Sequence, residues 1–281
     1  MSPRFAIVTD SAADMGALAQ ANGVDVVPLT IRFGNQEYRD GIDLSSAEFY
    51  AKLETTAQPP ITAQPAPAVF VDTYRRLLAE GAERILSLHI SAALSGTFNA
   101  ASIAAAMVDA RRIAVVDTRS VSAGIAMLAI DARRRFEAGD AFEDVERAIR
   151  ADVPCVELFA TVPNLTYLAR GGRIGGLRGL MGNVLKIVPI LTLKNGEVSE
   201  HAKVRTFARA VDQLVQTAVE RMPVKGRARI AILHSVAPEL AASIQERLRI
   251  AAEPRSEITC DIGPTVGTHA GPGAVGVCFI P

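Results

Sequence analysis

The chain has 281 residues, of which 49% are hydrophobic and 21% are charged, a balance typical of ordered globular proteins. Thirty basic and thirty acidic side chains cancel, so no net field attracts nucleic acid or an anionic membrane surface, and we expect no nucleic-acid partner. No run reaches the roughly 18 apolar residues of a membrane span, and the first apolar stretch is too short for a signal peptide.

Cys155, Cys260 and Cys278 lie far apart and lack metal-ligand spacing, which suits reduced thiols. We therefore expect a cytoplasmic protein with no metal, no cofactor and no integral membrane association.

The first half of the chain alternates β-rich runs with helical segments, the pattern of a parallel sheet covered on both faces. The expected strands are Phe5–Thr9, Val24–Leu29, Arg84–His89 and Ile113–Val116. The expected helices are Asp14–Ala21, Ala47–Glu54, Ala68–Glu80, Gly96–Val108 and Val121–Ala138. Ser45 and Glu48 form a capping box before the second helix. Repeated prolines between Thr56 and Pro67 predict a stiff, extended connector.

The pattern changes near Val153 and Pro154. The strands expected beyond this point are Glu157–Thr161, Ile187–Leu193, Val198–Lys203, Ile230–His234, Ile258–Ile262 and Ala274–Ile280. A helix from Arg205 to Met222 carries apolar residues at helical spacing. The sequence thus predicts two α/β domains: residues 1–154, with three layers around a parallel sheet, and residues 155–281, with a mixed sheet.

Ser95 and Gly96 stand where a hydroxyl-rich turn enters a helix. A helix start presents unpaired N–H groups and about half a positive charge, which favours an anionic head group. An ordinary serine N-cap explains Ser95 equally simply. Thr62, in the connector, could likewise bond only its own backbone.

Six short motifs in order give the chain a resemblance to the DegV family. They are Ile7-Val-Thr-Asp-Ser-Ala-Ala-Asp14, Ile61-Thr-Ala-Gln-Pro65, Leu94-Ser-Gly-Thr97, Val116-Asp-Thr118, Leu168-Ala-Arg-Gly-Gly-Arg173 and Gly267-Thr-His-Ala-Gly-Pro-Gly273. The resemblance implies a carrier that encloses a long-chain fatty acid between two domains. In many bacteria such carriers present the acid to a fatty acid kinase.

Carried over by position, the resemblance gives Thr62, Ser95, Gly96 and His269 to the carboxylate site. Ala63 replaces a serine that many members have, which removes one possible donor. His269 is expected in a glycine-rich turn, where backbone groups could instead satisfy it. Arg170 and Arg173 are expected in an exposed loop that docks the kinase, although arginines also suit a helix's last turn.

Composition suggests where the acyl tail would lie. The apolar run beside the Arg170 loop comprises Leu177, Leu180, Met181, Val184, Leu185, Ile187, Val188 and Ile190. Four alanines, Ala100, Ala101, Ala104 and Ala105, keep the facing helix thin. Small residues opposite large ones can leave a tunnel, although ordinary core packing is the more frequent outcome of such runs.

A serine hydrolase or acyltransferase is the main alternative, with Ser95 as nucleophile and His269 or His234 as base. It would need a base within hydrogen-bond reach, and no G-x-S-x-G elbow surrounds Ser95. Gly271–Gly276 matches G-x-G-x-x-G, but a strand is expected to follow it, which does not fit a dinucleotide site. No P-loop is present, so phosphoryl transfer would require a partner.

Overall fold

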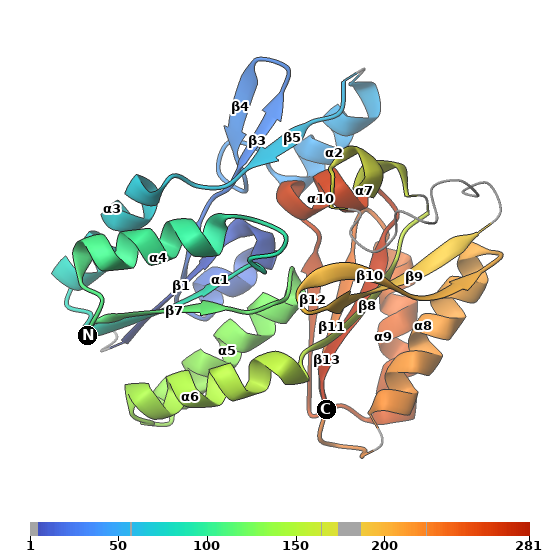
Figure 1. The fold of residues 1–281 in the computed structure, drawn as a ribbon. Helices are drawn as coiled ribbons and strands as arrows, with labels where there is room; N and C mark the ends of the chain where they lie inside the picture. Colours follow the sequence, from blue (N-terminus) through green and yellow to red (C-terminus); the bar gives the residue numbers. More distant parts are fainter. Residues whose placement is uncertain (1–4, 57, 164, 174–186, 223) are drawn as a thin grey trace.

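The computed structural model describes residues 5–56, 58–163, 165–173, 187–222 and 224–281. Its first sheet is fully parallel, with strands in the order β2-β1-β6-β7 (Figure 1). These strands are β1 (Phe5–Asp10), β2 (Val24–Val27), β6 (Arg84–His89) and β7 (Ile113–Asp117). All four predicted strands of the first half are confirmed.

Helices cover both faces of this sheet, because its strands alternate apolar side chains toward two separate cores. One face packs against α3 (Pro67–Ala79) and α4 (Thr97–Val108) through a core that includes Phe70 and Tyr74. The other face packs against α5 (Ala123–Glu137), which α6 (Phe142–Asp152) supports. The predicted three-layer arrangement is confirmed.

The second sheet is mixed and has six strands in the order β10-β9-β8-β13-β11-β12. They are β8 (Glu157–Thr161), β9 (Val188–Lys194), β10 (Glu197–Val204), β11 (Arg229–His234), β12 (Ser256–Asp261) and β13 (Val275–Ile280). Helices α8 (Phe207–Arg221) and α9 (Pro238–Ala252) cover its outer face. Its inner face shares one continuous core with α5 and the first sheet. All six strands follow residue 154, and the division into two domains at that point stays a prediction.

A small antiparallel sheet lies above the first (Figure 1), in the order β4-β3-β5. Its strands are β3 (Thr30–Phe33), β4 (Gln36–Arg39) and β5 (Ile61–Ala63). The connector between Thr56 and Pro67 contains an extended segment, as predicted, but the pairing of that segment, β5, with β3 was not predicted. Proline at 59, 60 and 65 bounds the strand on both sides and leaves room for only three paired residues. Helix α2 (Ser46–Thr55) begins with the predicted capping box of Ser45 and Glu48.

Strands β3 and β4 and helices α6 and α9 were not predicted, and several short helices also differ from prediction. The helix predicted over Asp14–Ala21 is shorter in the structure, where α1 comprises Ala17–Ala21 and a 3₁₀ turn, η1 (Ser11–Ala13), precedes it. A second 3₁₀ turn, η2 (Val153–Cys155), leads into β8, and α7 (Thr166–Arg170) follows that strand. Helix α10 (Pro264–Ala270) occupies the segment predicted as a glycine-rich turn. Proline at its first position suits a helix start, which explains how so glycine-rich a segment forms one.

Among the residues that the structure describes, no helix has both the length and the apolar character needed to cross a membrane.

Candidate functional site

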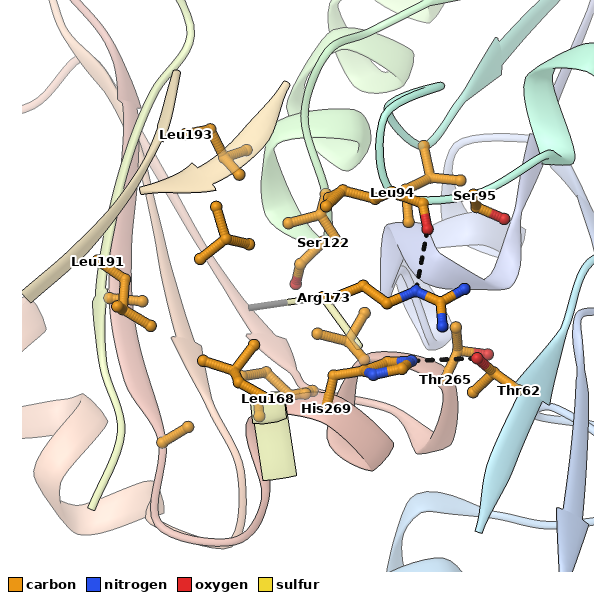
Figure 2. Close-up of a pocket in the computed structure, with 18 of the residues that line it drawn as sticks. Thr62, Leu94, Ser95, Ser122, Leu168, Arg173, Leu191, Leu193, Thr265 and His269 are labelled. Atoms are coloured by element: carbon orange, nitrogen blue, oxygen red, sulfur yellow. Dashed lines mark hydrogen bonds between the residues drawn. The ribbon is translucent and has the colours of Figure 1, made fainter. Parts of the chain in front are cut away.

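A cavity of about 380 Å³ lies between the two large sheets, within the size range of small-molecule sites. Its walls come from both halves of the chain: β5, the segment before α4 and the start of α5 on one side, and β8, β9, β13 and α10 on the other. Most of the lining is apolar, and polar side chains gather at one end (Figure 2). We call that end the mouth and define it by Thr62, Ser95, Arg173 and His269.

Thr62 and His269 meet at the mouth across the two halves of the chain. Thr62 projects from β5, and its Oγ1 lies 3.0 Å from Nε2 of His269 in the last turn of α10 (Figure 2). The predicted pair is thus brought together, although His269 sits on a helix and not in a turn.

The imidazole of His269 is neutral at physiological pH. Burial and the nearby Arg173 guanidinium lower its pKa from the ordinary 6.5 to about 4. Its Nδ1 is buried and has no hydrogen-bond partner among the residues that the structure describes. Gly171 lies against the ring so closely that a Cβ there would be 1.9 Å from Nδ1. Glycine at residue 171 therefore leaves the space that the His269 ring occupies.

Ser95 precedes α4, and Gly96 occupies the N-cap position without a side-chain cap. Ser95 Oγ lies 2.8 Å from Thr97 Oγ1 and accepts a hydrogen bond of 3.3 Å from Thr97 N. Both Ser95 and Gly96 line the cavity, as predicted for a head-group site. The side chain of Gln64 lies over Gly96, where a Cβ would be 1.8 Å from Gln64 Oε1. Glycine at 96 thus lets the segment after β5 rest on the start of α4.

Arg173 was predicted to face a partner, and the structure places its side chain across the mouth (Figure 2). Its Nε donates to the Leu94 carbonyl at 3.2 Å, and Nη1 donates to the Gly171 carbonyl at 2.8 Å. Arg170 is exposed at the end of α7 and does not line the cavity. The two arginines therefore occupy different environments. The R-G-G-R motif gave no signal for this difference.

The apolar part of the cavity differs from the predicted tail pocket. The four alanines Ala100, Ala101, Ala104 and Ala105 pack into the core between α3 and α4 and do not line the cavity. Their small size serves the close approach of α4 to α3 and to the sheet, so that prediction was wrong. Ile187, Val188 and Ile190 also lie outside the lining, and Val188 and Ile190 pack on the outer face of the second sheet. Leu177, Leu180, Met181, Val184 and Leu185 lie outside the described residues.

The lining that sequence reasoning missed is the inner face of the second sheet together with α10. Its apolar members are Leu158, Ala160, Val162, Leu191, Leu193, Val198, Leu233, Ile262, Val266, Ala270, Ala274 and Gly276. On β8 and β9 these residues alternate with residues of the outer core, which is the period-two signal of a strand buried on both faces. That signal predicts burial but cannot tell a packed face from one that borders a cavity.

Helix α10 is anchored at its start by two buried carboxylates from the first half of the chain. Asp14 accepts a hydrogen bond from Gly263 N at 2.9 Å and another from the Ser122 hydroxyl, and Asp40 accepts from Thr265 N at 3.1 Å. Burial raises the pKa of both aspartates. The helix that carries His269 is thus held at both ends by the other half of the chain.

The histidines do not form the pairs that the hydrolase alternative requires. Ser95 bonds with Thr97, and His269 with Thr62. His234 does have a carboxylate partner, which sequence reasoning had missed: its Nε2 lies 2.8 Å from Asp261. His234 does not line the cavity.

A hydrogen-bonded chain with the order of a catalytic triad lies within the first sheet. His89 Nε2 lies 2.7 Å from Ser87 Oγ, and His89 Nδ1 lies 2.9 Å from Asp10 Oδ2. All three residues have no exposed surface, so no substrate can reach this serine. Asp10 has a structural role: it also accepts hydrogen bonds from Ala12 N and Ile90 N.

Comparison with known proteins gives one consistent answer. The profile of the DegV family, described as uncharacterised, matches residues 4–281. A DegV domain-containing protein of Streptomyces coelicolor is 36% identical and covers 99% of this chain and 98% of its own length. The structure of a DegV family protein from Thermus thermophilus, titled for its fatty acid binding, aligns with a TM-score of 0.90 at 33% identity over 99% of both chains. DegV of Bacillus subtilis, described as a fatty acid binding protein, aligns with a TM-score of 0.88 at 28% identity over 99% of both chains. This chain belongs to the DegV family.

Proposed function

We propose that this chain is a carrier that binds a long-chain fatty acid non-covalently, with the acyl tail in the cavity and the carboxylate at the mouth. The observation that carries the proposal is the division of the cavity into a long apolar part and one polar end. Fatty acid binding by the Thermus thermophilus and Bacillus subtilis relatives supports it.

Chemistry at the mouth suits a carboxylate. With His269 neutral, Nε2–H can donate to Thr62 Oγ1, which leaves the Thr62 hydroxyl proton free for the ligand. Ser95 supplies a second hydroxyl and Arg173 a positive charge. Hydrogen bonds to an ionised carboxylate are stronger than bonds between neutral groups. The mouth therefore favours the ionised acid over a neutral ester of the same length.

The tail would supply most of the affinity. Burial contributes about 0.8 kcal/mol per methylene, so some fifteen methylenes give roughly 12 kcal/mol before the cost of ordering the chain. Contacts to the carboxylate would then matter mainly for position, because they hold the head group at the protein surface.

A carboxylate held at the surface can be reached by another protein, and we propose that an ATP-dependent fatty acid kinase uses it to form an acyl phosphate. The absence of a P-loop motif from the sequence supports a partner for this step. Arg170 points away from the cavity and is the proposed docking contact. Incubating lipid-loaded protein with kinase and ATP, and following acyl phosphate by ³¹P NMR, tests this part separately.

Native mass spectrometry tests the carrier function directly. The purified protein should show an added mass that disappears on denaturation and matches a fatty acid in the released lipid. If no fatty acid is recovered and delipidated protein does not take one up, the proposal fails. Turnover of a chromogenic ester that is lost in Ser95→Ala would instead support the hydrolase alternative.

A further inference from the structure

The floor of the cavity has a notch where two neighbouring strands carry their smallest inward side chains. Gly276 on β13 pairs with Ala160 on β8, and leucines flank the pair in the same row: Leu233 on β11 and Leu191 on β9. All four residues line the cavity. The cavity floor is therefore lowest at Gly276 and Ala160, and the larger leucine side chains raise it on either side.

Only glycine fits at residue 276, because neighbouring atoms crowd the position that a Cβ would take. A Cβ at Gly276 would lie 3.0 Å from Leu233 Cδ1, 3.0 Å from the Phe159 carbonyl oxygen and 3.1 Å from Ala160 Cβ. Ala160 is only half-buried although β8 is an interior strand of the sheet. Its exposed surface faces the cavity.

Position along the strands relates the notch to the mouth. Strand β13 begins shortly after α10, whose last turn carries His269, so successive residues of β13 lead away from the mouth. The next inward residue after Gly276 is Cys278, which is fully buried and does not line the cavity. Its partner on β8, Leu158, does line the cavity. On β8 and β13, Leu158 is thus the lining residue farthest from His269.

We propose that these residues select the length of the acyl chain: the notch of Gly276 and Ala160 admits the methylenes far from the carboxylate, and Leu158 stops the terminal methyl. This inference rests on the proposed fatty acid binding and adds which acids are accepted. A side chain that fills the notch excludes methylenes, and removal of the stop admits more. Each methylene gained or lost changes affinity about fourfold.

The test uses Ala160→Leu and Leu158→Ala in the full-length protein. Each is delipidated and titrated with saturated acids of increasing length in competition with a fluorescent fatty acid. Ala160→Leu should shift the preferred length down by two or more carbons, and Leu158→Ala should shift it up. Ala202→Leu is the matched control, because it makes the same substitution on the outer face of the same sheet. The chain-length preference of this variant should equal that of the wild type.

Unchanged preferences in both variants, or shifts in the opposite directions, overturn the inference. If Ala160→Leu does not fold, Leu158→Ala decides alone, since it only removes atoms. A wild-type protein that binds no fatty acid would instead refute the proposed function, and the two failures are therefore distinguishable.

Discussion

Thr62 Oγ1 and His269 Nε2 lie 3.0 Å apart although 207 residues separate them in the chain. The contact joins an edge strand of the small sheet to the last turn of α10. It can form only when both halves of the chain are in place, so the polar end of the cavity exists only in the assembled fold.

Replacing Thr62 by valine keeps the shape of the side chain and removes its hydroxyl. We expect fatty acid affinity to fall about ten- to a hundredfold, because a hydrogen bond to a charged group is lost. Competition with a fluorescent fatty acid measures the change. Thr73→Val is the control, since Thr73 is half-buried on α3, does not line the cavity, and its hydroxyl donates to the Val69 carbonyl. Wild-type lipid occupancy in a Thr62→Ala, Ser95→Ala double variant would contradict the assignment of both residues.

Substitutions of Arg170 and Arg173 should have different effects, since only Arg173 lines the cavity. Arg173→Ala should lower fatty acid affinity about two- to fivefold, the modest effect expected of an exposed charge. Arg170→Ala should leave affinity unchanged and reduce acyl phosphate formation with the kinase. Equal lipid affinities in both variants would return Arg173 to the docking role predicted from sequence.

The pKa of His269 gives the pH dependence a definite sign. Its pKa is about 4 when folded and 6.5 when unfolded, so the unfolded chain takes up a proton first as pH falls. The stability that His269 contributes is complete above pH 6.5 and is lost progressively between 6.5 and 4. NMR titration of the ring should give a midpoint near 4 without ligand and a higher one with fatty acid, whose negative charge favours imidazolium. A ligand-free midpoint near 6.5 would be inconsistent with the buried site.

Gly171→Ala should weaken binding without touching the ligand. The new methyl group would meet His269 Nδ1 at 1.9 Å and push the ring away from Thr62. The neighbouring Gly172 has nothing within 4 Å of an added Cβ, but its φ of +70° makes alanine strained. Gly172→Ala should therefore lower the melting temperature and preserve affinity. The comparison fails if both variants bind the fatty acid equally well.

The sequence was sufficient for the strands of both large sheets and for residues that the structure brings together at the mouth, and insufficient for the cavity walls. Period-two and period-three-to-four patterns located the large strands and helices because burial dictates those residues locally. Thr62, Ser95 and His269 were found through short motifs. By contrast, the alanines of α4 were assigned to a tunnel although they pack on α3, because composition does not tell which neighbour a small side chain faces. The position of the Arg173 side chain at the mouth was also not predicted, because the motif does not tell in which direction that side chain lies.

The anchoring of α10 by Asp14 and Asp40 has a consequence for the whole chain. The segment that would grip a carboxylate is also a joint between the halves, so an occupied cavity would behave like a reversible cross-link. By mass action, a ligand at a hundred times its dissociation constant adds about 2.7 kcal/mol to the folded state. A higher concentration of free fatty acid would therefore increase the resistance of the entire protein to unfolding and proteolysis.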